Sequence, residues 1–303
     1  TEVVVLEVGL GGRLDATNVV DPAVAVVTGV ALDHEAILGT DILGIAREKA
    51  AIFKPGRAAV VGSSGEAVAI PFLAEQAQLR LACPVFRVGI DTPAEPPPEW
   101  PVALRGGHQR RNAACALAAL DALEQATAGR LSVGSDLRRQ ALASVSWPGR
   151  LEKIPGTPPV WLDAGHNPDG ARALAAELVK TAAPGRPLVV VVGVSADKDC
   201  GEVLGPVARL AHVLVASQAP SPRALAAGEL ARIASILPDP AQPRRIIVEP
   251  DPLEAVRLAQ EEAGPEGTVV VYGSIYLVGA ARALLLGEPL DAVALHDPAG
   301  PIG

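Results

Sequence analysis

Short apolar runs alternate with amphipathic stretches along the first half of the chain, a pattern typical of α/β proteins. Runs rich in valine, isoleucine and alanine predict buried strands, and apolar residues at helical spacing predict helices. The predicted strands are Val3–Val8, Ala23–Val30, Ala58–Gly62 and Pro84–Gly89. The predicted helices are Ile42–Phe53, Ala67–Leu79, Asn112–Leu123 and Asp136–Val145, with Asn112 as an N-cap. The proline-rich segment Asp91–Pro101 is expected to be a loop.

The second half of the chain alternates strands and helices with little interruption, which implies a mostly parallel sheet with helices on both faces. The predicted strands are Val160–Ala164, Leu188–Val194, His212–Ala216, Arg245–Val248 and Thr268–Tyr272. The predicted helices are Pro168–Ala182, Gly201–Ala211, Pro222–Ile236, Pro252–Ala263 and Ile275–Leu286. Pro148 and Gly149 break the pattern between the halves, so we expect two domains, 1–148 and 149–303, and an irregular tail over Glu288–Gly303.

Three polar residues fall where a site could form. Glu7 ends the first predicted strand and His34 follows the second, and ligands of open α/β sheets bind at the carboxyl ends of strands. Glu7 is either a metal ligand or a carboxylate that caps a turn. A lone histidine such as His34 is more often structural than a ligand, and Lys49 can be an ordinary solvated lysine of a helix.

Gly9, Gly11 and Gly12 follow the first predicted strand and would let the backbone turn sharply. Their spacing is GxGG, not the GxGxxG of dinucleotide-binding loops, so the cofactor signal is weak. Asp15 just beyond them is either a turn aspartate or a hydrogen-bonding group for a ligand.

Composition narrows the class of protein. The chain has 303 residues, of which 49% are hydrophobic and 20% charged, as in a globular protein rather than a disordered one. The net charge of −8 argues against nucleic-acid binding through a basic face. We see no apolar run of membrane-spanning length and no secretory signal, and the three cysteines lack metal-ligand spacing. We therefore expect a cytoplasmic protein with no membrane or nucleic-acid partner.

Three longer motifs carry a family resemblance. They are LEVGLGGRLDATN at Leu6–Asn18, LDH at Leu32–His34 and REKAAIFKPG at Arg47–Gly56. Together they resemble the folylpolyglutamate synthase/dihydrofolate synthase family of the Mur ligase superfamily. The resemblance implies a P-loop-type Mur ligase central domain, an ATPase, over 1–148. It implies a doubly wound, mostly parallel α/β glutamate-ligase domain over 149–303.

The start of the chain departs from that family. The family carries a P-loop of the type GTNGKGS upstream of LEVGLGG, and these 303 residues contain neither that loop nor any methionine. We expect that the ATPase domain is truncated here, without its P-loop portion, and that the piece by itself is inactive.

The resemblance assigns metal ligation to Glu7, His34 and Lys49, with Lys49 carbamylated so that its anionic oxygens bind a second Mg²⁺. Lys49 and His34 would thereby be catalytic, because two metal ions can stabilise charge on a phosphoryl group in transfer. Ala51 stands where the family usually has glycine. Leu14, Asp15 and Ala16 would approach the pterin-bearing substrate.

A second set of positions matches the ATP contacts of the family. They are Asn112 in HQRRNAA, Arg150 in PGRLE, and Asp163 and His166 in LDAGHNP. The family pattern D-x-A-H-N reads D-A-G-H-N here, which keeps the spacing. Each residue alone could also form an interdomain salt bridge or cap a helix, and His166 and Asn167 could cap the helix near Pro168.

The implied activity is ATP-dependent addition of L-glutamate to dihydropteroate, to reduced folates, or to both, through an acyl phosphate, by a monomer that uses Mg²⁺. The sequence leaves the choice of substrate open. One alternative is a cell-wall ligase of the Mur type, which joins an amino acid to a nucleotide-linked peptide. Another is a non-catalytic nucleotide- or folate-binding protein.

Overall fold

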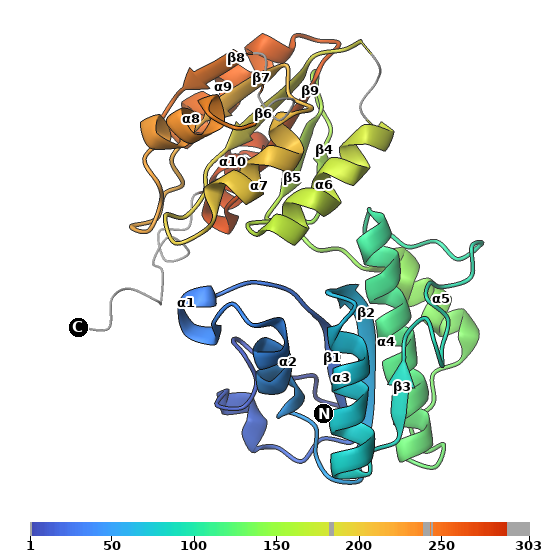
Figure 1. Cartoon of the computed structure of the whole chain (residues 1–303). Coiled ribbons are helices and arrows are strands. Elements are labelled where there is room, and N and C mark those ends of the chain that lie inside the picture. Colours follow the sequence, from blue (N-terminus) through green and yellow to red (C-terminus); the bar gives the residue numbers. More distant parts are fainter. Residues whose placement is uncertain (1, 182–184, 239–242, 244, 290–303) are drawn as a thin grey trace. The chain divides into compact units, whose positions relative to one another are not determined.

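The computed structural model describes residues 2–181, 185–238, 243 and 245–289, and it divides into two compact units (Figure 1). The first unit comprises Thr1–Ala103 and Gly107–Val145, and the second comprises Leu104–Gly106 and Ser146–Gly303. The division lies close to the predicted boundary at 148/149, but the assignment of the short segment Leu104–Gly106 to the second unit was not predicted. Arg105 in this segment stacks its guanidinium over the Trp161 ring, 5.2 Å from the centroid.

The first unit is built on a three-stranded parallel sheet in the order β1-β2-β3. Alternate side chains of β2 face opposite ways, so Ala59 and Val61 join one buried cluster while Ala58 and Val60 join another. Helices α2 and α3 contribute to the first cluster and α4 to the second. The element bounds are β1 Val24–Val30, α1 Glu35–Leu38, α2 Ile42–Ala50, β2 Ala58–Gly65, α3 Ala69–Glu75, a π-helical turn Gln76–Arg80, β3 Val85–Arg87, α4 Gly107–Ala126 and α5 Ser135–Ser144.

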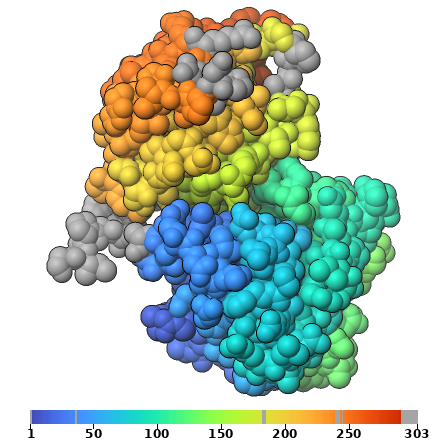
Figure 2. All heavy atoms as spheres, in the orientation of Figure 1, coloured from blue at the N-terminus to red at the C-terminus, as the bar shows by residue number. Residues whose placement is uncertain are grey.

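The predicted strand Val3–Val8 is wrong. These residues form no strand in the structure, and Val5 is 92% exposed. In Figure 2 the dark-blue N-terminal stretch of the chain lies on the surface of the first unit. A β-branched run becomes a strand only where a neighbouring backbone completes its hydrogen bonds and another layer covers one face. Among the strands that the structure describes, β1 is the edge of the sheet and pairs with β2 alone.

The predicted N-cap at Asn112 is also wrong, because α4 begins at Gly107 and Asn112 lies inside the helix. Arg110, in the first turns of α4, holds the proline-rich loop. The Arg110 Nε donates to Glu95 Oε2 at 2.8 Å, and one of its terminal nitrogens donates to the Pro96 carbonyl at 2.9 Å. Arg110 therefore fastens the proline-rich loop, which is a loop as predicted, to the first turns of α4.

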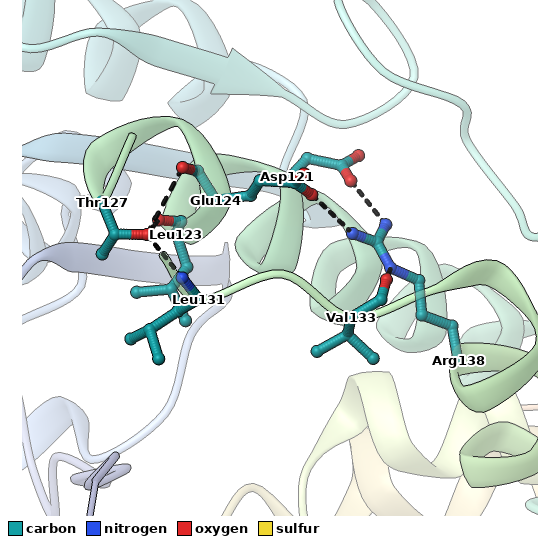
Figure 3. Close-up of polar contacts among 7 residues, drawn as sticks. All are labelled: Asp121, Leu123, Glu124, Thr127, Leu131, Val133 and Arg138. Carbon is teal, nitrogen blue, oxygen red and sulfur yellow. Dashed lines mark hydrogen bonds and ion pairs between the residues drawn. The ribbon is translucent and has the colours of Figure 1, made fainter. Parts of the chain in front are cut away.

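Arg138 on α5 ties the end of α4 to the connection between the two helices (Figure 3). Its Nε donates to the Val133 carbonyl at 2.7 Å, and its two terminal nitrogens meet Asp121 and Glu124 of α4. The side chain is only 14% exposed, so these contacts are better shielded from solvent than an ordinary surface ion pair.

Substituting Arg138 with methionine is expected to lower the free energy of unfolding by about 1–2 kcal/mol, because Asp121 and Glu124 lose their partner and Val133 its donor. Urea titration measures the change. Arg139→Met is the matched control, since the side chain of Arg139 is 51% exposed and, among the described residues, forms an ion pair only with Asp136, which is 90% exposed. Equal losses of unfolding free energy in the two variants would show that the contacts of Arg138 stabilise the fold no more than an exposed ion pair does.

The second unit contains a six-stranded sheet in the order β4-β5-β9-β6-β7-β8, parallel except for β4, which runs antiparallel to β5. Helices α6, α7 and α8 cover one face, and α9 and α10 cover the other. The bounds are β4 Glu152–Ile154, β5 Val160–Asp163, α6 Pro168–Thr181, β6 Leu188–Val192, α7 Cys200–Ala208, β7 Val213–Ala216, α8 Ala227–Ser235, β8 Arg245–Val248, α9 Pro252–Ala263, β9 Thr268–Tyr272 and α10 Ile275–Leu286.

This architecture confirms the predicted α/β fold class. The central strands β6, β7 and β9 read as nearly continuous valine runs because both faces of the sheet are covered. The sequence pattern missed β4, which is only three residues long, and placed the start of α8 at Pro222 instead of Ala227.

Most of the predicted tail, 290–303, lies outside the described residues. Across the described part of the chain, none of the helices combines the length and apolarity that a membrane crossing requires.

Candidate functional site

The glycine-rich loop after Glu7 docks against the last turn of α2. A Cβ on Gly12 would lie 2.7 Å from the Glu48 carbonyl oxygen and 3.3 Å from the Lys49 Cα, so only glycine fits there. The next residue, Arg13, donates its backbone N–H to the Glu48 carbonyl at 3.1 Å and its Nε to Glu48 Oε1 at 2.9 Å. Gly11 supplies the sharp turn, with φ of +67°. The motif at Leu6–Asn18 thus meets the motif at Arg47–Gly56 beside Lys49.

Asp15 closes this loop with its own carboxylate. Its Oδ2 accepts from the Gly9 N–H at 2.9 Å, and its Oδ1 accepts from the N–H and the hydroxyl of Thr17 at 2.8 and 2.5 Å. The bonds from Thr17, followed by that from Gly9, lower the pKa of Asp15 from its ordinary 3.8 to about 2. The turn role is therefore the one that the described contacts show for Asp15, while Leu14 beside it is 81% exposed.

A carboxyl-carbon NMR titration is expected to find Asp15 titrating at about 2 in the folded chain. Because the folded pKa is depressed, the stability that the ionised carboxylate contributes is present above the unfolded pKa and is lost as pH falls through about 2. Thr17→Val removes the hydroxyl and should raise the Asp15 pKa toward 3.8. A value near 3.8 in the unsubstituted chain would contradict the described turn.

Asp33 links the predicted residues His34 and Lys49. Both Asp33 and His34 follow the carboxyl end of β1, as the sequence indicated. Asp33 Oδ1 accepts the His34 N–H at 2.8 Å and lies 3.9 Å from His34 Nε2. His34 has φ of +53°, a left-handed conformation that is uncommon for a residue with a side chain and often occurs at functional sites.

Lys49 is half-buried on α2, and this burial lowers the pKa of its amine, while the charge of Asp33 acts in the opposite direction. A lowered pKa increases the fraction of neutral amine at a given pH. The neutral amine is the form that reacts with CO₂ to give a carbamate.

The donor set suits Mg²⁺ only in part. Among the described residues there is no group of three or more His, Cys, Asp or Glu side chains placed to share one ion. Glu7 is exposed, and no hydrogen bond or ion pair within the described residues joins it to His34 or Lys49. Mg²⁺ keeps several waters and uses few protein carboxylates when phosphate oxygens are present. An oxygen-rich carbamate on Lys49 would add an anionic ligand to this set.

The second unit carries a separate group of predicted residues at the carboxyl end of β5. Asp163 is 6% exposed, and its two oxygens accept from the Leu151 N–H at 3.0 Å and the Gly165 N–H at 2.8 Å. Its carboxylate thereby fastens the loop that contains Arg150 to the end of β5. The Arg150 side chain is exposed and has no hydrogen bond or ion pair among the described residues, which leaves its guanidinium available to an anion.

His166 and Asn167 lie between β5 and α6. His166 Nδ1 lies 3.0 Å from the Ala164 carbonyl, and this contact helps to orient the imidazole ring. Asn167 caps α6, because its Oδ1 accepts from the Gly170 N–H at 2.8 Å. Asn112, the remaining predicted contact, belongs to the first unit, where its Nδ2 donates to Gln109 Oε1 at 3.2 Å.

Two residues of this region were not predicted. Glu152 accepts the Gly149 N–H at 2.8 Å and is held in turn by Arg282 of α10. The sequence carried no usable signal for this pair, since the partners are 130 residues apart.

Comparison with known proteins places the two units in one family. The family model described as "Mur ligase, glutamate ligase domain" matches residues 149–275. A dihydrofolate synthase/folylpolyglutamate synthase of Mycobacterium tuberculosis is 33% identical over 95% of this chain and 65% of its own length. A folylpolyglutamate synthase of Lacticaseibacillus casei is 33% identical over 94% of this chain and 67% of its own length. This chain therefore spans about two thirds of these relatives.

Solved structures of the same family are similar to this chain in fold. Escherichia coli FolC in complex with DHPP and ADP matches with a TM-score of 0.78 at 29% identity, covering 92% of this chain and 65% of that one. Folylpolyglutamate synthase of Mycobacterium tuberculosis, complexed with ADP and AMPPCP, matches with a TM-score of 0.79 at 32% identity, covering 94% and 68%. The resemblance predicted from the sequence is thereby confirmed: the chain belongs to the folylpolyglutamate synthase/dihydrofolate synthase family.

Proposed function

We propose that this chain is the larger part of an ATP-dependent ligase that adds L-glutamate to dihydropteroate, to reduced folates, or to both. The observation that carries the proposal is the docking of the Leu6–Asn18 loop onto α2 beside Lys49, which joins the two longest family motifs in one place. The named relatives support the substrate class, because they include both dihydrofolate synthases and folylpolyglutamate synthases. LEVGLGGRLDATN favours this branch over a cell-wall ligase of the Mur type.

The proposed reaction has two steps. A carboxylate of the pteroate or folate attacks the γ-phosphate of ATP, which forms an acyl phosphate and releases ADP. The amine of glutamate, after losing a proton, then attacks the acyl carbon, and phosphate leaves as the amide bond forms. The residues of this chain act mainly by positioning the reactants and stabilising charge.

Arg150 is proposed to bind phosphate oxygens of the nucleotide through its exposed guanidinium. Asn112 and His166 are proposed as further nucleotide contacts. Because both Asp163 oxygens accept backbone N–H groups, we propose that Asp163 acts by holding the Arg150 loop, and not by a contact with the nucleotide itself.

Mg²⁺ would neutralise charge on the transferring phosphoryl group when bound. We propose that His34, a carbamylated Lys49 and Glu7 provide the protein ligands for two ions, with nucleotide oxygens and water completing each set. A related structure from Yersinia pestis, at 30% identity and a TM-score of 0.75, is complexed with AMPPNP and a manganese ion. That ion has the same preference for oxygen ligands.

The substrate loop is proposed to present Leu14 and Ala16 to the pterin-bearing substrate. Leu14 offers exposed apolar surface, and Asp15 maintains the turn through its bonds to Gly9 and Thr17.

We further propose a cytoplasmic monomer whose ATPase and glutamate-ligase domains are 1–148 and 149–303. The three cysteines, which are free and buried, are consistent with a reducing compartment.

A glutamate-dependent ADP assay tests this function. The full-length product of the gene and the 303-residue chain are incubated side by side with MgATP, and with or without L-glutamate and a folate acceptor. We expect ADP formation that requires both glutamate and acceptor in the full-length product, and none in the 303-residue chain. Binding of nucleotide without any ADP formation in the full-length product would favour the non-catalytic alternative instead.

A further inference from the structure

The loop that carries Arg150 has an unusually constrained backbone. Gly149 has φ of +68° and Leu151 has φ of +48°, so both neighbours of Arg150 lie in the left-handed region. This conformation is costly for leucine, by about 1 kcal/mol or more, and persists only where the surroundings impose it. The Leu151 side chain is 2% exposed in the core of the second unit, which anchors one side of the loop.

Hydrogen bonds hold the loop on either side of Arg150. On one side, the Gly149 carbonyl accepts the Ala164 N–H at 2.7 Å and the Gly149 N–H donates to Glu152 Oε2 at 2.8 Å. On the other side, the Leu151 N–H donates to Asp163. All of these contacts are made by the neighbours of Arg150, and none is made by the Arg150 side chain. The loop therefore fixes the position of the Arg150 backbone and leaves its guanidinium without a hydrogen bond from these contacts.

Arg282 determines where Glu152 lies. Its Nε donates to both carboxylate oxygens of Glu152, at 3.1 and 3.2 Å, and its Nη1 donates to Glu288 Oε2 at 2.8 Å. The Arg282 and Glu152 side chains are 27% and 21% exposed. Arg282 also offsets the charge of Glu152, a carboxylate two residues from Arg150 that would otherwise repel a bound phosphate.

We infer that Glu152 and Arg282 are positioning residues that orient Arg150 toward the nucleotide phosphates. The inference rests on the proposed function, since it assumes that Arg150 binds a nucleotide. Glu152 acts through the Gly149 N–H, and Arg282 acts by fixing Glu152. Neither side chain is required to touch the nucleotide.

A double-mutant cycle in the full-length product of the gene tests this inference. The dissociation constant of Mg-AMPPNP is measured by calorimetry for the unsubstituted protein, Glu152→Ala, Arg150→Ala and the double variant. We expect Glu152→Ala to weaken binding about tenfold, the order expected when one charge-assisted hydrogen bond is lost. In the Arg150→Ala background, the same substitution should leave the dissociation constant unchanged.

Two further variants make the test specific. Glu152→Gln keeps an oxygen that can accept the Gly149 N–H, so it should restore most of the affinity that Glu152→Ala loses. Glu262→Ala is the matched control, because it removes another Arg–Glu pair of this unit, with Arg245 at 2.8 and 3.1 Å, away from the loop. This control should leave the affinity unchanged.

The outcomes separate the two proposals. Equal weakening by Glu152→Ala with and without Arg150 would show a general structural role and overturn this inference, while nucleotide binding and the proposed function stand. Unchanged affinity in Glu152→Ala would overturn it as well. No binding of Mg-AMPPNP by the unsubstituted protein would overturn the proposed function together with this inference.

Discussion

Replacing Arg150 with alanine is expected to lower kcat/KM for ATP about a hundredfold, equivalent to about 2.7 kcal/mol of transition-state stabilisation. The loss is large because a guanidinium that binds phosphate forms charge-assisted hydrogen bonds in a fixed planar geometry. The unfolding free energy should barely change, since the exposed Arg150 side chain forms no hydrogen bond or ion pair within the described part of the chain.

Two comparisons sharpen this expectation. Arg150→Lys keeps the charge but not the planar pair of donors. Its kcat/KM should therefore lie between that of the unsubstituted protein and that of Arg150→Ala. Arg257→Ala removes an exposed arginine of α9 whose one ion pair within the described part of the chain is with Glu254, and it should leave ATP kinetics unchanged. A normal kcat/KM in Arg150→Ala, measured by steady-state ADP formation, would exclude the proposed phosphate contact.

Replacing Lys49 with methionine is expected to lower kcat on the order of a thousandfold, comparable to the loss of one major electrostatic stabiliser of a transition state. Methionine has a similar length and cannot be carbamylated. The fold should tolerate the change, because Lys49 is half-buried and burial already disfavours its charged form. Turnover and urea unfolding of the same variant separate the catalytic loss from any structural one.

Carbon dioxide supplies a second test at Lys49. If the carbamate is the working form, activity should fall after CO₂ is depleted and should recover on addition of bicarbonate. Lys49→Met should respond to neither treatment, and Lys54→Met, with a lysine whose amine donates to Asn18, should respond as the unsubstituted protein does. Activity that is indifferent to CO₂ in the unsubstituted protein would rule out the carbamate.

The sequence predicted the second unit better than the first, for a physical reason. Strands such as Leu188–Val192 are buried on both faces, so each appears in the sequence as a continuous apolar run that marks where the strand lies. Val3–Val8 is also rich in valine but has no described pairing partner, and composition alone cannot report whether a neighbouring strand exists. Asn112 failed as an N-cap because the helix was extended by residues such as Arg110, whose bonding partners lie in a distant loop.

The candidate site was predictable in its membership but not in its geometry. Motifs located Lys49, Asp15 and Arg150. They could not reveal that the Asp15 carboxylate accepts hydrogen bonds within its own turn, or that the Asp163 carboxylate accepts one from the Arg150 loop. Those roles depend on which N–H groups the fold brings to each carboxylate. The Glu152–Arg282 pair joins residues far apart in the chain, so no local pattern could have indicated it.

Product mass tests the central claim most directly. The full-length product of the gene is incubated with MgATP, L-glutamate and either dihydropteroate or tetrahydrofolate, and the products are analysed by mass spectrometry. The account predicts that at least one acceptor gains the mass of a glutamyl residue in an ATP-dependent manner. Gain on dihydropteroate alone identifies a dihydrofolate synthase, gain on tetrahydrofolate alone a polyglutamylase, and gain on both a bifunctional enzyme. A folded protein that binds ATP but adds glutamate to neither acceptor would contradict the account.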